Sequence, residues 1–187
     1  MSQVTYWQYP GLPLTTERLV IRGMRMEDLE PMVRFHSNPV AMRYVGRGDT
    51  WSRGFTEDII VRIIGNTRNH PLDWVTIGDR KTAEFLGMVC VLRLGQVHRD
   101  RIPNAPVHEI GWRMLPEHWN KGYATEAAGA VVRWAFGEEK VPELGCIVDE
   151  RNIPSCRVAE KVGMAYEVTY ELEGQRIRFH RLMRVMG

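Results

Sequence analysis

A stretch of the chain has the apolar periodicity of a long amphipathic helix, and a strand-like segment comes directly before it. Apolar side chains recur there at steps of three and four residues, at Ala124, Ala127, Ala128, Val131, Val132, Ala135 and Phe136. The alanines that open this stripe are small enough for the helix to pack very close to a sheet. Three strand-like segments, 73–78, 85–94 and 107–115, precede it and are separated by turn-rich loops. This order predicts an antiparallel meander that leads into a helix lying on its sheet.

The rest of the chain alternates between strand-like and helix-like patterns. Further strands are expected at 18–22, 144–148, 164–170 and 176–184, and further helices at 26–35, 39–44, 55–68 and 153–162. Asn152 is a typical N-cap for the last helix, and Gly163 is a typical stop signal after it. No repeat or long linker divides the sequence. We therefore expect one α/β domain over residues 1–187, with an N-terminal extension at 1–13 and a mixed sheet covered by helices on both faces.

Composition excludes several classes of protein. The formal net charge of +2 argues against a chain that coats nucleic acid, which needs a clustered basic face. Three cysteines, Cys90, Cys146 and Cys156, are too few for a disulfide framework, and the six histidines lack metal-binding spacing. No apolar run approaches the roughly 20 residues of a membrane span, and the first residues lack a signal-peptide pattern. We expect a cytoplasmic protein without a metal site that binds neither membranes nor nucleic acid.

The segment 116–127 joins the strand at 107–115 to the long helix. Unpaired backbone N–H groups and the positive end of the helix dipole meet at such a junction, and together they favour an anion. Gly122 lets a ligand approach the backbone, Lys121 adds a positive charge, and Thr125 adds a hydroxyl. An ordinary strand-to-helix turn would also use a glycine here, so the physical pattern alone leaves both interpretations open. Neither the P-loop motif nor the dinucleotide-binding GxGxxG motif is present.

At this junction the sequence resembles the GNAT N-acetyltransferase superfamily, in particular its RimJ/RimL-like branch of ribosomal-protein N-terminal acetyltransferases. That branch has a motif of the approximate form W-G-K-G-Y-A-T-E-A, and residues 119–127 here read WNKGYATEA. Asn120 replaces the usual Gly, and Trp119 stands where the superfamily at large has Arg or Gln, which removes one phosphate contact. Segments 14–22, 109–114 and 152–164 resemble further family segments in the same order. The resemblance therefore spans about residues 14–184.

The resemblance implies a fold, a co-substrate and the residues that bind it. The fold is a mixed, mostly antiparallel central sheet of about seven strands, in which the family's fourth and fifth strands, here 107–115 and 144–148, splay apart. Acetyl-CoA is the expected co-substrate, with its pyrophosphate at the junction and its pantetheine arm against the exposed strand backbone. The residues expected to bind it are Trp112, Met114, Leu115, Asn120, Lys121, Gly122, Tyr123, Ala124, Thr125 and Asn152.

The expected reaction is the direct attack of a primary amine on the thioester in a ternary complex, which needs placement and a proton acceptor. Glu109 is the candidate general base because it lies just before the cofactor segment; an exposed or ion-paired carboxylate is the alternative. His108 lies on the opposite face of a regular strand. Ser155 is the candidate acid for the departing thiolate, because Ala159 stands where some family members have Tyr; a local turn is the alternative. Cys156 is interpreted as a small packed side chain.

The sequence leaves the acceptor open. A protein N-terminal α-amine and a small-molecule amine, such as an amino acid, a polyamine or an antibiotic, both fit, and a non-catalytic acyl-CoA sensor is a rival from a different class. The helices between 26 and 44 and the hairpin at 167–178 are expected to border the acceptor side, where Trp51 is a candidate lining residue. Glu171 and Glu173 would suit a cationic acceptor unless they are simply solvated. A homodimer is compatible with the sequence.

Overall fold

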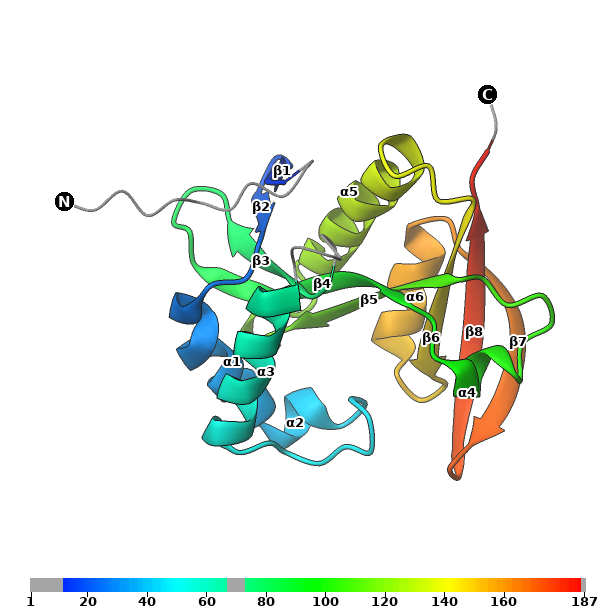
Figure 1. Ribbon diagram of the computed structural model, residues 1–187, viewed down its shortest axis with the longest axis horizontal. Coiled ribbons are helices and arrows are strands. Elements are labelled where there is room, and N and C mark those ends of the chain that lie inside the picture. Colours follow the sequence, from blue (N-terminus) through cyan, green and yellow to red (C-terminus); the bar gives the residue numbers. More distant parts are fainter. Residues whose placement is uncertain (1–11, 67–72, 186–187) are drawn as a thin grey trace.

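The computed structural model describes residues 12–66 and 73–185 (Figure 1). Its strands are β1 Leu14–Thr15, β2 Leu19–Arg22, β3 Val75–Asp79, β4 Phe85–Arg93, β5 His108–Met114, β6 Glu143–Asp149, β7 Ala165–Leu172 and β8 Gln175–Met183. Its α-helices are α1 Leu29–His36, α2 Pro39–Met42, α3 Arg53–Asn66, α4 Gln96–Arg99, α5 Tyr123–Gly137 and α6 Ile153–Lys161. Two short 3₁₀ helices, η1 Met26–Asp28 and η2 Pro116–His118, precede α1 and α5. The predicted N-terminal extension at 1–13 falls mostly outside the described residues.

The strands form one mixed sheet of eight strands in the order β1-β2-β3-β4-β5-β6-β8-β7. Every neighbouring pair is antiparallel except β5 and β6, which are parallel. These two strands are in register only at Glu109 and Gly145 and then separate (Figure 1), so the predicted splay is confirmed. A Cβ on Gly145 would lie 2.7 Å from the Phe179 ring and 2.9 Å from Pro106, so only glycine fits where the strands meet.

Apolar layers cover both faces of the sheet, as predicted. On one face, α5 and α6 bury the predicted stripe, including Ala127 and Val131, against strands β2 to β6. On the other face, α1, α2 and α3 pack Phe35 and Ile60 against Met88 of β4. Burying a large apolar side chain of this kind contributes about 1.5–3 kcal/mol relative to leaving it exposed. The two layers hold β5 between them and so fix the strand that carries the candidate base.

Residues 14–22, expected to form one opening strand, form two. Thr16 turns the chain between them: its N–H donates to the Leu19 carbonyl at 3.0 Å, and its Oγ1 accepts the Leu19 N–H at 2.9 Å. β1 then folds back antiparallel on β2. This two-residue strand raises the count from the expected seven to eight. Apolar periodicity cannot detect a strand of two residues.

Local signals set the ends of the later elements. Asn152 Oδ1 accepts the Ser155 N–H at 3.3 Å at the start of α6, and Gly163, with φ +93°, follows its end. The β7–β8 hairpin turns on Glu173 and Gly174, with φ +50° and +77°, as a two-residue type I′ turn requires. The loop expected at 95–106 contains the short helix α4. Four residues are too few to show a helical period.

Candidate active site

The junction between β5 and α5 presents backbone N–H groups at a helix start. Gly122, which precedes α5, has φ +80°, and Asn120 has φ +58°, so the turn is left-handed at two positions. Glu126 N–H donates to the Gly122 carbonyl at 3.0 Å, which leaves the first three N–H groups of α5 without intrahelical partners. Lys121 is exposed beside them. This geometry suits an anion, and binding of one here stays a prediction.

Arg18, just before β2, ties this junction to the first strands. Its Nε donates to Glu126 Oε2 at 2.7 Å, and its Nη1 donates to the Lys121 carbonyl at 2.9 Å. Glu126 Oε1 accepts the Thr16 hydroxyl at 2.5 Å and the Arg18 N–H at 3.0 Å. The guanidinium also lies over the Tyr123 ring, 4.7 Å from its centroid. The contact spans 108 residues, so no local pattern in the sequence indicated it.

One edge of β5 faces the gap that opens toward β6. Leu115 N–H donates to the Leu86 carbonyl of β4 at 3.0 Å. Because backbone groups alternate in direction along an antiparallel strand, those of Trp112 and Met114 point toward the gap. The Met114 carbonyl accepts the indole N–H of Trp119 at 2.8 Å. Of the three residues predicted to contact pantetheine, Trp112 and Met114 therefore face the gap, whereas the Leu115 amide is bonded within the sheet.

One hydrogen bond links β5 to the start of α6, and a second caps that helix. Trp112 Nε1 donates to Ser155 Oγ at 3.1 Å, and Ser155 N–H donates to Asn152 Oδ1. Asn152 therefore serves as the helix cap. Since Ser155 Oγ accepts the indole N–H, the hydroxyl proton of Ser155 is available to a second partner. Ala159, at the position where some family members have Tyr, is fully buried in the core.

Glu109 lies on the sheet face that carries α1, α2 and α3. Leu92 is its neighbour across the strands, and Gly111 and Arg113 follow it on the same face. Burial raises the pKa of Glu109 to about 7. His108 lies on the opposite face of the strand, and burial lowers its pKa. Glu109 is thus a carboxyl group on this face of β5, and its charge changes near neutral pH.

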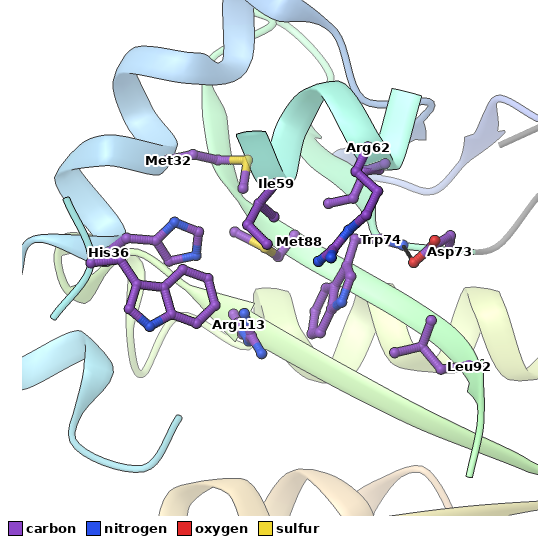
Figure 2. A pocket seen from close by; sticks show the side chains of 11 residues that line it. Met32, His36, Ile59, Arg62, Asp73, Trp74, Met88, Leu92 and Arg113 are labelled. Atoms are coloured by element: carbon purple, nitrogen blue, oxygen red, sulfur yellow. Dashed lines mark hydrogen bonds between the residues drawn. The ribbon is translucent and has the colours of Figure 1, made fainter. Parts of the chain in front are cut away.

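A pocket of about 250 Å³ opens on the same face of the sheet (Figure 2). We call it the α1–α3 pocket, and its lining residues are Met32, His36, Trp51, Ile59, Arg62, Ile63, Asp73, Trp74, Met88, Leu92 and Arg113. Trp51 lines this pocket; that the pocket receives the acceptor stays a prediction. Leu92 belongs to this lining and is paired with Glu109 across the strands, so Glu109 lies next to a residue of the pocket wall on the same face of the sheet.

Side-chain contacts join the tip of the β7–β8 hairpin to the loop after α2. Arg47 Nε donates to Glu173 Oε2 at 3.2 Å. Glu171 faces Arg176 across the hairpin. The two glutamates expected to suit a cationic acceptor are therefore balanced by arginines.

Cys156 is buried at the start of α6, and burial raises the pKa of its thiol. A packed thiol, and not a thiolate nucleophile, fits this environment. Among the described residues, His, Cys, Asp and Glu side chains form no group of three that could hold a metal ion. Within the same ranges, no helix has the length and apolarity to cross a bilayer.

Comparison with known families decides what this arrangement is. Residues 18–165 match the family model described as an acetyltransferase (GNAT) domain. The chain belongs to the GNAT acetyltransferase family. The matched range includes the splayed strands, the junction before α5 and Glu109. The protein is therefore an acetyltransferase of a family that uses acetyl-CoA.

Relatives of this GNAT protein match it over most of its length. It is 30% identical over 158 residues to the uncharacterized protein YkkB of Bacillus subtilis (strain 168), covering 83% of this chain and 87% of YkkB. It is 28% identical over 154 residues to the uncharacterized N-acetyltransferase YnaD of the same organism, covering 82% and 83%. A solved GNAT-family acetyltransferase from Bacillus anthracis has a TM-score of 0.78 over 91% of this chain and 98% of that chain, at 23% identity. That structural likeness shows the shared fold.

Three polar residues of this GNAT site were not singled out from the sequence. Arg113 had a signal, because Glu109, Gly111 and Arg113 alternate along one strand and must share a face. Arg18 and His36 had none. Both reach the site through contacts between segments far apart in the chain.

Proposed function

We propose that this enzyme acetylates a primary amine by direct attack on acetyl-CoA in a ternary complex, with Glu109 as the general base. The observation that carries the proposal is the place of Glu109: it forms the one residue pair between the splayed strands, with Gly145, and it is paired across β4 and β5 with Leu92, which lines the α1–α3 pocket. An amine with a pKa near 10 is mostly protonated at neutral pH. A carboxylate with a pKa of about 7 is substantially ionised at neutral pH and can accept the proton that the nitrogen loses as it bonds to the acetyl carbon.

The co-substrate would lie across the gap between β5 and β6. The amides at the start of α5, with Lys121 and Thr125, would bind the pyrophosphate. The pantetheine arm would run along the backbone of Trp112 and Met114 as an added strand does. The other predicted contacts, Leu115, Asn120, Tyr123, Ala124 and Asn152, would border the same path. What supports this placement is the alternation along β5 and the left-handed turn before α5.

The bond changes balance without a protein nucleophile. A protonated acceptor first loses one proton to solvent. The neutral nitrogen then forms a bond to the acetyl carbon, the carbon–sulfur bond breaks, and the second nitrogen proton passes to Glu109, which releases it to solvent. The departing thiolate takes a proton from the Ser155 hydroxyl as solvent delivers one to the Ser155 oxygen, so that no alkoxide is left behind. The free proton of Ser155 supports this role, because its oxygen already accepts from Trp112.

The acceptor and the branch of the family belong to the proposal as well. The WNKGYATEA segment at 119–127 supports the RimJ/RimL-like branch, whose acceptor is a protein N-terminus, while a small-molecule amine remains the alternative. The single-domain organisation over 1–187, the homodimer and the cytoplasmic location stay predictions from the sequence. The rival from another class is a non-catalytic acyl-CoA sensor.

The test is release of free thiol from acetyl-CoA across a library of amines and N-terminal peptides. We expect turnover with a subset of amines, and a loss of about a hundredfold or more in Glu109→Gln at neutral pH. Calorimetry should show that Glu109→Gln still binds acetyl-CoA. Glu139→Gln, an exposed carboxylate after α5, is the matched control. Tight acetyl-CoA binding without thiol release for any amine would favour the sensor.

A further inference from the structure

Arg113 is a partly buried cation on the floor of the α1–α3 pocket. Its guanidinium stacks on Trp74, 4.2 Å from a ring centroid, and it forms no ion pair with any described residue. Met88, its neighbour across the strands, is apolar. The other charged lining residues, Arg62 and Asp73, are of opposite sign, so Arg113 leaves the pocket with a net positive charge. A guanidinium withdrawn from water without a counter-ion is unfavourable, and a bound anion would relieve it.

His36 supplies an unpaired hydrogen-bond acceptor in the same pocket (Figure 2). The Thr56 hydroxyl donates to the Ser52 carbonyl at 3.0 Å, so it can only accept from His36 Nδ1, which lies 3.2 Å away. Nδ1 therefore carries the ring proton, and Nε2 is a bare acceptor. Within the described part of the chain, Nε2 is buried without a partner. Burial and the charge of Arg113 lower the pKa of His36 to about 4, so the ring is neutral at pH 7.

These two groups are complementary to a particular kind of ligand. Arg113 offers the planar donors that suit a carboxylate, and His36 Nε2 needs an N–H or O–H donor. The ring of Trp51 lies 4.3 Å from that of His36, so an aromatic surface closes this end of the pocket. A polyamine would bring a second positive charge against Arg113, which costs free energy in a partly buried site.

The distance between Arg113 and the candidate base Glu109 fits an acceptor that has an amine at one end and an anionic group at the other. Glu109 and Arg113 are four residues apart on β5, which separates their Cα atoms by about 13 Å along the strand. Gly111 lies between them and has no side chain to block the path. The two side chains shorten this span, so an amine at Glu109 and an anion at Arg113 can belong to one small molecule or short peptide.

We infer that the acceptor amine carries a carboxylate, that Arg113 binds this carboxylate in the α1–α3 pocket, and that an adjacent N–H or O–H group donates to His36 Nε2. The inference rests on the proposed function, because it assigns the acceptor class of the same reaction. It separates the alternatives left open by the sequence, since a polyamine lacks the carboxylate.

The experiment compares acids with their own amides. The probes are amino acids and dipeptides with free carboxylates, the same compounds as C-terminal amides, and spermidine as a polyamine. We expect kcat/KM from thiol release to favour the free acids by about tenfold to a hundredfold, the range for one charge-assisted bidentate pair. In Arg113→Gln the ratio of kcat/KM for the acids to kcat/KM for their amides should fall to about one. Arg133→Gln, an exposed arginine on α5, should behave as the wild type.

The outcomes separate this inference from the proposed function. Equal turnover of acids and amides by the wild type, or preference for spermidine, would overturn the inference while leaving the acetyltransferase reaction intact. If no probe releases thiol, calorimetric titration of the CoA-loaded protein with the same acids and amides decides the inference alone. Acid-selective binding that Arg113→Gln abolishes would support it. Equal binding of acids and amides, or no binding of the acids, would contradict it without using turnover.

Discussion

Arg18 and Glu126 join the segment before β2 to the first turn of α5, with Nε and Oε2 2.7 Å apart. The same guanidinium donates to the carbonyl of Lys121, so one side chain holds both the helix and the turn before it. In a GNAT protein this turn is the expected pyrophosphate site. The contact therefore connects the opening segment of the domain to cofactor binding.

We predict that Arg18→Gln weakens acetyl-CoA binding by about threefold to tenfold, because the loop must then be ordered by the ligand. The free energy of unfolding should fall by about 1 kcal/mol or less, since the ion pair is partly exposed. Calorimetry and urea unfolding measure the two effects. Arg53→Gln, which breaks an exposed ion pair with Glu30 far from the junction, is the control. An unchanged dissociation constant in Arg18→Gln would contradict the positioning role.

Gly122 and Gly163 allow backbone strain and cofactor binding to be separated. Both have positive φ, +80° and +93°, so alanine at either position should lower the free energy of unfolding by about 1 kcal/mol. A Cβ on Gly122 would also lie 3.3 Å from Arg18 Nη2. We predict that only Gly122→Ala raises the dissociation constant for acetyl-CoA. If both substitutions changed the dissociation constant for acetyl-CoA equally, the weaker binding would result from reduced stability and not from a change at the cofactor site.

The sequence predicted those elements whose signals are local. The stripe from Ala124 to Phe136 has a 3.6-residue period, and it predicted α5 because one face had to be buried. Asn152 and Gly163 predicted the two ends of α6 through cap and turn chemistry. The splay between β5 and β6 came from the family resemblance, and its physical sign is a single point of register at Glu109.

The remaining features depend on contacts between distant segments. Glu126 belonged to the recognised motif, yet its partner Arg18 lies 108 residues away. His36 reads as an ordinary residue at the end of a short helix, and only the packing of α3 beside it buries its ring and fixes its tautomer. In the sequence, Glu171 and Glu173 indicate a site for a cationic acceptor. The sequence does not show that Arg47 pairs with Glu173, because Arg47 lies in a loop more than a hundred residues earlier.

The pKa of Glu109 predicts the pH dependence of the reaction. Burial raises it to about 7, so the carboxylate form that accepts a proton is scarce at pH 5.5 and dominant at pH 8. We predict that kcat/KM rises with pH through about 7 in the wild type. In Glu109→Gln the limb near pH 7 should disappear along with most of the rate, whereas Glu139→Gln should keep both. A wild-type profile that is flat from pH 6 to 8 would exclude Glu109 as the base.

The same pKa predicts an opposite effect on stability. The folded state holds the Glu109 proton more tightly than the unfolded state, in which the pKa is near 4.5. The contribution of the protonated Glu109 carboxyl to the free energy of unfolding is therefore fully present below pH 4.5 and is lost as the pH rises through 7. Glu109→Gln should raise the free energy of unfolding by about 1–3 kcal/mol at pH 8 and change it little at pH 4.5. Urea unfolding at the two pH values tests this, and an equal gain at both would contradict burial of the charge.

The proposed role of the Ser155 hydroxyl as a proton donor can be tested with substitutions that remove or keep the hydroxyl and leave the backbone of α6 unchanged. We predict that Ser155→Ala lowers kcat by about tenfold to a hundredfold, because the thiolate loses its proton donor, while the affinity for acetyl-CoA changes little. Ser155→Thr keeps a hydroxyl at the same position and should retain most of the rate. Both variants preserve the backbone N–H that Asn152 caps, but Ser155→Ala leaves the Trp112 indole N–H without its acceptor, so its free energy of unfolding should fall by about 1 kcal/mol. A wild-type kcat in Ser155→Ala would leave Ser155 only the structural role of accepting the Trp112 indole N–H, and solvent would then protonate the thiolate.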